Sequence, residues 1–448
     1  MISKSKIFIY IGKSMKSKII FLIIPILLLF SSCRADTENT DTENTKETLI
    51  MAYPSEVEEF YFNKFQQSES NELIAMFNQK SEDFTIQKQE YESYDKLLMD
   101  ILSGRSFDLL YVGDWLDMTS MYNKGILCDL NELIASDPEI SRDIYVEPVL
   151  DALEINGKLY QMPRNFNIES AVVKADNWDN DTDNSIEHLC EKAERLGYEL
   201  PFDLSPYSFS FPYIVSSEFI DLDNSTCNFT DGRFENLLVI MKKFTDYYGS
   251  EAINYPNGAS DLFKEDKLMI MSASIANFDH IKDLTMRSGA KLKHIGLPSE
   301  ISNYHIAIPI VSFSIFESSE NKAGAFEFIK YYTSYNTYVN ENPSAGENVT
   351  NIAFIPINKA ALEYAAEDSL SKKMNLFYTN LDDETIKEYH DDILEQIYSV
   401  NGAGTSIGSD IKNILTDEIP YYLSGSKSAS EVCEMIQNRV STYLAEKG

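Results

Sequence analysis

The stretch YDKLLMDILSGRSFDLLYVG (Tyr94–Gly113) contains the pattern that decides the fold. Its first half has helical spacing and ends at a glycine, and its second half, Phe107–Gly113, is a short apolar run typical of a buried parallel strand. Upstream, Thr48–Tyr53 and Phe84–Tyr91 are predicted to be strands and Asn71–Ser81 a helix. Strands and helices therefore alternate, which predicts an α/β fold with a mixed, mostly parallel sheet flanked by helices.

The alternation continues toward the C-terminus with a larger share of helices. Without a leader, about 415 residues remain, more than one hydrophobic core usually organises, so we expect two lobes. No long repeat and no internal linker occurs, which favours a chain that weaves between the lobes. Helices are predicted at Asn131–Glu139, Asn184–Gly197, Arg233–Tyr248, Asn321–Ser334 and from Ser428 or Ser430 to Lys447, and strands at Lys267–Ser274 and His305–Phe316.

The N-terminus has the order of a bacterial lipoprotein signal. Five lysines and no acid precede Ile19–Phe30, an apolar run of 12 residues that is too short for a bilayer span of about 20. Two serines then lead to Cys33, so residues 1–32 are predicted to be a signal peptide and Cys33 the diacylated first residue of the mature chain. Met15 is as suitable an initiator methionine as Met1, because a complete signal follows it. The alternative is ordinary signal-peptide cleavage with an incidental cysteine.

The segment after Cys33 is polar and contains DTENT twice, which predicts a disordered tether over residues 33–47. Removal of the five leader lysines from 38 basic residues leaves 33 against 71 acidic ones, a net charge of −38. Nucleic-acid binding and docking by charge on anionic membranes require basic surfaces, so both are excluded. A lipid on Cys33 is the expected attachment to the extracellular face of the cell membrane.

Motifs for catalysis or metal binding are weak. GTSIG (Gly404–Gly408) matches the G-x-S-x-G pattern of a hydrolase nucleophile, but no histidine follows it, as that catalytic order requires. The five histidines and the four cysteines beyond Cys33 show no zinc spacing and no C-x-x-C, and no phosphate-binding loop motif occurs. We therefore expect no catalytic residue, no metal and no cofactor, and cysteines that are buried free thiols.

The two tryptophans are informative because they are rare. Trp115 directly follows the predicted strand Phe107–Gly113, where open α/β sheets place their ligands. A tryptophan there suits the C–H face of a sugar, with Asp114 beside it for hydroxyl groups; the alternative is a packing anchor between two helices. Trp178 lies in a polar stretch and is expected at the surface or at an interface.

Several segments in order resemble the extracellular solute-binding lipoproteins of ABC importers, the class similar to maltose-binding protein. The segments are LLMDILSGRSFDLLYVGDW (97–115), YNKGILCDLNELI (122–134), INGKLYQMP (155–163), the stretch 219–244, IGLPSE (295–300), NKAGAFEFIKYYTS (321–334), FIPINKAAL (354–362) and the C-terminal helix. The sequence departs from the family pattern at RNFNIES (164–170), at FKEDKLMIM (263–271) and at an acidic-aromatic stretch after the first strand. These departures lie near the expected cleft and leave the identity of the ligand open.

The resemblance implies two lobes joined by crossing hinge segments, an N-lobe of residues 48–162 plus 305–352 and a C-lobe of 163–304 plus 353–448. It implies a monomeric receptor that captures a solute, first of all a carbohydrate, between the lobes and delivers it to an ABC permease without chemical change. Two alternatives remain: a lipoprotein of this fold used for sensing or adhesion, and a surface glycosidase or esterase. Ligand contacts are expected from Asp114, Trp115, Arg164, Asn165, Asn277, Phe278 and Tyr304, with aromatic rings stacking and polar groups binding hydroxyls.

Overall fold

The structure is a computed structural model, and its elements belong to one compact unit, Thr45–Gly448. The predicted signal peptide, most of the predicted tether, Cys33, Asp114, Trp115 and the centre of GTSIG lie outside the described residues. No described helix is both long and apolar enough to cross a membrane. The described residues are 46–54, 61–113, 118–178, 183–206, 208, 211–221, 224–251, 258–299, 304–341, 354–371, 382–404 and 408–447.

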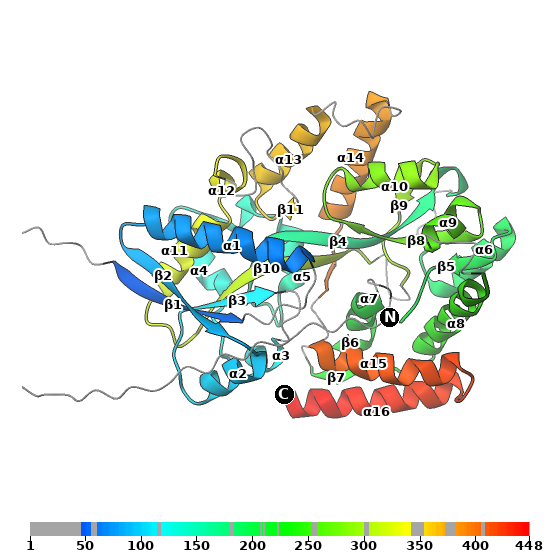
Figure 1. The fold of residues 1–448 in the computed structure, drawn as a ribbon, viewed down its shortest axis with the longest axis horizontal. Helices are drawn as coiled ribbons and strands as arrows, with labels where there is room; N and C mark the ends of the chain where they lie inside the picture. Colours follow the sequence, from blue (N-terminus) through cyan, green and yellow to red (C-terminus); the bar gives the residue numbers. More distant parts are fainter. Residues whose placement is uncertain are drawn as a thin grey trace, which may run out of the picture. The chain divides into compact units, whose positions relative to one another are not determined.

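The first three strands form the parallel arrangement that the sequence predicts. They are β1 (Glu47–Pro54), β2 (Phe84–Tyr91) and β3 (Leu109–Gly113), in the order β2-β1-β3 (Figure 1). The connecting helices are α1 (Tyr61–Lys80) and α2 (Tyr94–Leu102). Ser93 begins α2 by accepting a hydrogen bond from the backbone N–H of Lys96.

Two long antiparallel strands join this half of the molecule to the other half. They are β4 (Met162–Lys174), which has 13 residues, and β10 (Ile306–Ile315). One edge of β10 pairs with β3 and then β12 (Gly402–Ala403), while β4 pairs with β11 (Ile355–Pro356), β8 (Leu268–Ile275) and β9 (Leu292–His294). β5 (Leu200–Phe202) completes the order β2-β1-β3-β10-β4-β8-β5. The mixed sheet is confirmed, but its central pairs are antiparallel, and β4 was not predicted as a strand.

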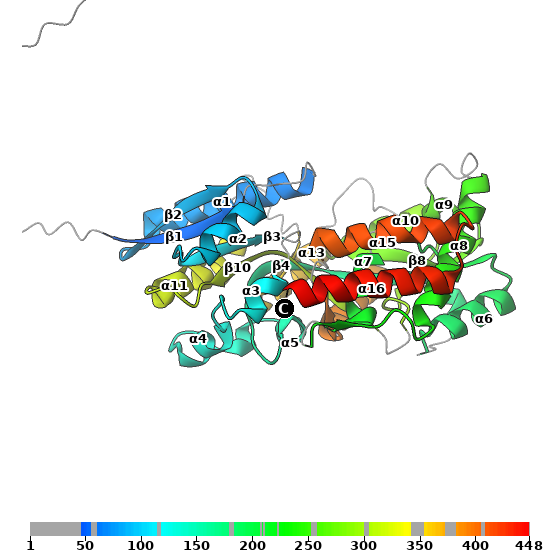
Figure 2. The same ribbon diagram turned by 90° about the horizontal axis from the view of Figure 1, so that it is seen from below.

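Helices cover both faces of the sheet. α1 and α11 (Lys322–Tyr332) lie along the N-terminal half, and α15 (Gly408–Leu423) and α16 (Ala429–Lys447) lie side by side in the other half (Figures 1 and 2). The remaining elements are α3 (Thr119–Asn123), α4 (Leu130–Ser136), α5 (Glu147–Leu153), α6 (Ile186–Leu196), α7 (Phe211–Phe219), the hairpin β6 (Ile220–Asp221) and β7 (Thr226–Cys227), α8 (Arg233–Glu251), α9 (Ala259–Lys264), α10 (His280–Ser288), α11 (Lys322–Tyr332), α12 (Tyr335–Val339), α13 (Lys359–Ser371), α14 (Asp383–Tyr398), α15 (Gly408–Leu423) and α16 (Ala429–Lys447).

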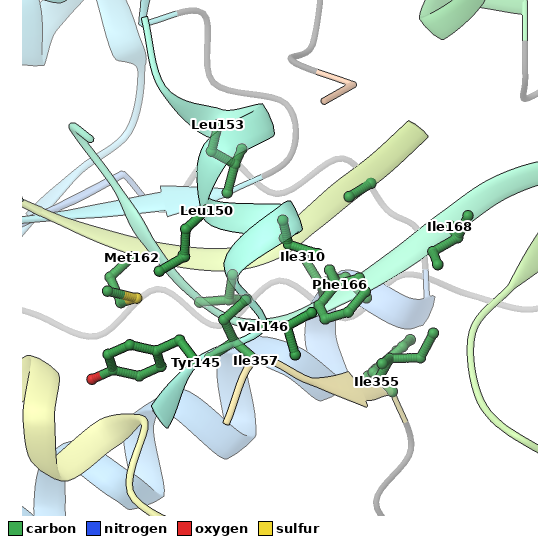
Figure 3. Packing of buried hydrophobic residues seen from close by; sticks show 14 of the residues in the cluster. Tyr145, Val146, Leu150, Leu153, Met162, Phe166, Ile168, Ile310, Ile355 and Ile357 are labelled. Atoms are coloured by element: carbon green, nitrogen blue, oxygen red, sulfur yellow. The ribbon is translucent and has the colours of Figure 1, made fainter. Parts of the chain in front are cut away.

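The largest hydrophobic cluster crosses the junction between the two halves. Figure 3 shows Phe166 and Ile168 of β4 packed with residues of α5, β10 and β11, among them Leu150, Ile310 and Ile355. Burial of such side chains is the main favourable contribution to folding, at roughly 25 cal/mol per Å² of apolar surface. The junction is therefore part of the continuous core and does not consist of a loose linker.

Two minor sequence expectations are corrected or refined. Trp178 was expected at the surface or at an interface, but it is only 9% exposed, and the Lys192 ammonium lies 3.8 Å from its ring centroid. Packing in the hydrophobic cluster that includes Ile186 and Leu189 of α6 removes the ring from solvent despite its polar sequence neighbours. Four cysteines are free thiols, as predicted; Cys128 and Cys433 are buried, and the other two are half-buried.

Candidate functional site at the strand junction

The candidate site is built on one face of β4. Side chains of a strand point alternately to its two faces, so Phe166 and Ile168 enter the large core, whereas Asn165, Asn167 and Glu169 point to the opposite face. We call these three residues the polar row. All three lie within RNFNIES, where the sequence departs from the family pattern.

The polar row contains buried oxygen atoms without protein partners. Asn165 is 8% and Glu169 2% exposed, and Asn167 is partly exposed. Among the described residues, no hydrogen bond reaches Oδ1 of either asparagine or Oε1 of Glu169, although all three atoms are buried. Buried polar atoms are nearly always hydrogen-bonded in folded proteins, so a row of three without partners marks a place where a ligand or water would bind.

Burial controls the protonation of Glu169. Removal from water raises the pKa of its carboxyl group to about 8, and a hydrogen bond with Ser274 of β8 acts in the opposite direction. The next serine along the same face, Ser272, donates its backbone N–H and its hydroxyl to Asp203, both at 2.8 Å. Burial raises the pKa of Asp203 to about 7, against those hydrogen bonds. Two carboxyl groups with raised pKa values thus lie along one face of β8.

The polar row separates two apolar clusters on its face of the sheet. Ile306 and Ile308 of β10 lie opposite Glu169 and Asn167, and they pack with α7, α8, α15 and α16. In the N-terminal half, the same face carries the cluster that packs with α2 and α3, which includes Val112 of β3. The row therefore lies where the two halves of the molecule meet, between their separate cores.

Two tyrosines lie beside this junction against glycines of the β12 segment. A Cβ atom on Gly402 would lie 3.0 Å from the ring of Tyr304, and one on Gly404 would lie 2.4 Å from the ring of Tyr213. Burial raises the pKa of the Tyr304 hydroxyl, and the nearby Glu218 carboxylate adds to the effect. The glycines of the NGAG segment thus permit close aromatic packing, and one of them, Gly404, is the first glycine of the GTSIG sequence that resembles a hydrolase motif.

Of the predicted ligand contacts, Asn165 lies in the polar row and Tyr304 beside the junction. Asn277 follows the end of β8, where Ile275 pairs with Ile168, and its side-chain oxygen accepts the backbone N–H of Asp279 at 3.0 Å. Phe278 is buried and stacks on His390 of α14 at 5.1 Å, within the large core. Its placement in the core does not support a stacking contact with a ligand.

Arg164 lies on the face of β4 opposite the polar row and is 1% exposed. Its guanidinium donates to the hydroxyl and the carbonyl of Thr337, each at 2.9 Å, and to Glu69 at 3.2 Å. It also lies 3.9 Å from the ring centroid of Tyr338. These contacts give Arg164 a structural function between β4 and α12, and they do not support its predicted contact with a ligand.

Sequence reasoning missed Asn167 and Glu169. A signal was present, because N-x-N-x-E from Asn165 to Glu169 repeats polar residues at the strand period of two. Once the segment is read as a strand, the repeat places all three side chains on one face. No group of three possible metal ligands occurs among the described residues.

A groove of about 540 Å³ lies beside β12, between the end of α5 and the α7–β7 segment. Its acidic lining residues are Glu154, Glu218 and Asp221, and no lysine or arginine is among its described lining residues. Ala403 of β12 lines the groove and lies in sequence between the two glycines that contact the tyrosines. The groove therefore carries three carboxyl groups, one of which, Glu154, is paired with Arg142.

Comparison with known proteins identifies the fold. No protein-family model and no curated protein matches the sequence. The structure matches an extracellular solute-binding protein, family 1, from Alicyclobacillus acidocaldarius, with a TM-score of 0.54 and 14% identity over 89% of this chain and 98% of that one. The sugar-binding protein MalE of Xanthomonas citri matches with a TM-score of 0.55 and 13% identity over 89% of this chain and 98% of that one. An ABC substrate-binding protein of Listeria monocytogenes in complex with cycloalternan matches with a TM-score of 0.50 and 13% identity over 89% and 99%.

These similarities define the class of fold. The chain has the two-lobed α/β fold of the MalE-like solute-binding proteins, and β4 and β10 are the strands that join its lobes. The matched proteins are named as binding proteins and not as enzymes. The exact lobe boundaries remain a prediction.

Proposed function

We propose that this protein captures an extracellular carbohydrate between its two lobes. The observation that supports the proposal is the polar row, whose buried oxygen atoms lack protein partners at the junction of the lobes. Sugar hydroxyl groups would donate hydrogen bonds to these oxygens, while Tyr304 and Tyr213 offer apolar ring surface nearby. The names of several matched structures include sugars or oligosaccharides as ligands, among them cycloalternan and mannobiose.

Closure of the lobes follows from this arrangement. A solute bound to the polar row would touch the inner surfaces of both lobes when they approach each other. Only contacts that are better in the closed form shift the equilibrium toward closure, so the second lobe must contribute to affinity. The binding protein then changes shape without making or breaking bonds.

The protein would be attached to the membrane through lipid on Cys33 and would deliver its solute to an ABC permease. The lipoprotein-like order of residues 1–33 and the polar tract after it support this part of the proposal. A tether of about 14 residues has a mean span of roughly 20 Å, which would keep the lobes close to the extracellular face of the cell membrane. Replacement of Cys33 by serine should release the protein from the membrane fraction and abolish incorporation of a labelled fatty acid.

Binding and turnover can be tested in one experiment. Mature protein is titrated calorimetrically with mannobiose, mannotriose and cycloalternan, and the solute is then recovered and its mass measured. We expect binding of at least one neutral oligosaccharide, recovery of unchanged solute, and a loss of affinity of about tenfold in Asn167→Ala, since one good hydrogen bond contributes roughly 1–1.5 kcal/mol. Asn438→Ala, on the exposed surface of α16, is the matched control.

The other outcomes separate the alternatives. Hydrolysis of the oligosaccharide would show a glycosidase and overturn the proposal. Absence of binding across a broad panel of sugars would instead favour a lipoprotein of this fold that serves in sensing or adhesion. Membrane release by Cys33→Ser with unchanged sugar affinity would separate the anchor from the binding site.

A further inference from the structure

The polar row presents three buried hydrogen-bond acceptors that no donor of the described residues reaches. Oδ1 of Asn165, Oδ1 of Asn167 and Oε1 of Glu169 are the unpartnered buried atoms, and an ionised carboxylate accepts but cannot donate. Adjacent members of the row are two residues apart, which in a strand is about 6.6–6.8 Å. The atoms are therefore too far apart to satisfy one another and require donors from a bound molecule.

Glu169 also lacks a compensating positive charge among the described residues. Two other buried or largely buried carboxylates have one: Glu418 binds Arg439, and Glu69 binds Arg164. Arg164 comes from β4 itself but points to the opposite face, so it does not neutralise Glu169. A buried carboxyl group in this state either keeps its proton or requires a cation from outside the protein.

On the basis of the proposed function, we infer that the site selects a solute with an alkylammonium group, such as an amino sugar or an amino polyol, over its neutral counterpart. An ammonium group has three N–H donors and a positive charge, so it would satisfy Glu169 in both respects. Hydroxyl groups of the same solute would reach Asn167 and Asn165 along the row. An ammonium group bound to Glu169 would supply both the hydrogen-bond donors and the positive charge that this carboxylate lacks among the described residues.

The charge of the surroundings agrees with this preference. The groove beside β12 is lined by Glu154, Glu218 and Asp221, and no lysine or arginine is among its described lining residues. Glu154 is paired with Arg142, which lies outside this lining, and the carboxyl groups of the groove would attract a cationic solute more than a uronic acid or a sugar phosphate.

Other titratable groups near Glu169 must be distinguished from it. On β8, Ser274 carries no charge, but Ser272 holds Asp203, which has a pKa of about 7. Before β10, Tyr304 lies in the field of Glu218 and Arg233. His305 precedes the strand partner of Glu169, and burial lowers the pKa of its imidazole below the usual value. Among these groups Asp203 has the raised pKa nearest to that of Glu169, so its variant is required as a control.

The test compares 1-amino-1-deoxyglucitol with glucitol, a pair that differs in one ammonium group. Calorimetric affinities of the mature protein are measured from pH 6 to pH 8.5, a range in which an alkylamine keeps its proton as lysine does. We expect the amine to bind at least tenfold more tightly at pH 8.5. Its affinity should rise with pH by about tenfold or more, since each unit below the pKa of Glu169 reduces the ionised fraction about tenfold.

Two variants assign the effect to the polar row. Glu169→Gln keeps the shape of the side chain and should remove both the preference for the amine and its pH dependence. Asn167→Asp adds a second carboxylate to the row and should increase the preference several-fold. Asp203→Asn should leave the preference in place, and a thermal melt of each variant confirms that it is folded.

Three results would overturn the inference. The first is equal or tighter binding of glucitol across the pH range. The second is a preference for the amine that survives in Glu169→Gln. The third is binding of neutral oligosaccharides without binding of either test solute, which would leave the carbohydrate receptor standing and reject the cationic preference; no binding of any solute would reject both.

Discussion

The ring of Tyr213, in α7, lies against the backbone of Gly404, which follows β12. A Cβ atom built on Gly404 would lie closer to Cδ1 of the ring than real Cβ atoms approach, and it would lie tightly against Ile308, at 3.0 Å. The contact joins a helix of one lobe to the segment that runs beside the crossing strand β10. A glycine is therefore required here for close approach, with no need for an unusual backbone angle.

Gly404→Ala should consequently destabilise the protein by about 1–3 kcal/mol, the usual cost of overpacking a core. Chemical denaturation measures the change. In the double variant with Tyr213→Ala, part of the loss should be recovered, because the ring that clashes is absent. Equal losses from Gly404→Ala with and without Tyr213 would show that the ring is not the cause.

The sequence predicted the β2-β1-β3 arrangement well because each of its elements is locally consistent. The apolar periodicity of Phe84–Tyr91 matches β2 residue for residue, and the glycine stop at Gly104 adopts a φ of +91° just after α2. These features depend on neighbouring residues in the chain. They can therefore be recognised without knowledge of the tertiary contacts.

The junction could not be predicted in the same way. β4 is buried on both sides by strands and helices that are distant in sequence, so outside N-x-N-x-E its residues do not alternate between polar and apolar. Arg164 and Asn165 are adjacent polar residues, yet one supports α12 and the other faces the site. From the sequence, both residues were expected to lie in the cleft. Only the pairing of β4 in the sheet shows that their side chains point to opposite faces.

Arg164→Met should test that separation. Removal of a fully buried, paired guanidinium typically costs 3–5 kcal/mol, since Glu69 and the carbonyl of Thr337 lose their donor. We expect a large decrease in the unfolding free energy and no more than a twofold change in the solute affinity of the folded protein. Arg105→Met, whose side chain is 46% exposed in its ion pair with Asp100, should change stability by less than about 1 kcal/mol. A tenfold affinity loss without destabilisation would restore Arg164 as a ligand contact.

The start of the C-terminal helix α16 provides a smaller and more local prediction. Ser428 accepts the backbone N–H of Glu431, whose carboxylate accepts the N–H and the hydroxyl of Ser428. This is a reciprocal capping box, so Ser428→Ala should reduce stability by about 1 kcal/mol in denaturant titrations. Ser430, the other serine that the sequence offered as a cap, is exposed, and Ser430→Ala should have an effect of less than about 0.5 kcal/mol. The opposite ranking of the two variants would place the cap at Ser430.

The capping box should also respond to acid. Hydrogen bonds from Ser428, first of all from its backbone N–H, lower the pKa of Glu431 below its usual value. A carboxyl group whose pKa is lowered by folding stabilises the folded protein fully above its unfolded-state pKa. This stabilisation is lost as the pH falls through the folded-state pKa. The difference in stability between the wild type and Glu431→Gln should therefore shrink as the pH is lowered below about 4. A stability difference that stayed constant below about pH 4 would contradict an ionised Glu431 in the capping box.

Glu169 should affect stability with the opposite pH dependence. A glutamate in an unfolded chain has a pKa of about 4.3, whereas burial raises the pKa of Glu169 to about 8 in the folded protein. Between these values the unfolded chain has released the proton that the folded protein keeps, so the unfolding free energy decreases as the pH rises through this window. Glu169→Gln removes the titration, and its stability relative to the wild type should increase by an amount on the order of a few kcal/mol between pH 5 and pH 9.

Denaturant titrations of the wild type and Glu169→Gln at matched pH values measure this difference without any solute. Asp203→Asn is the comparison, because the pKa of Asp203 is also raised, to about 7, so its relative gain should be complete about one pH unit earlier. A relative stability of Glu169→Gln that does not depend on pH would mean that Glu169 is ionised in the folded protein at neutral pH. The carboxylate would then have a positive partner in the protein, and it would no longer require a cation from the solute.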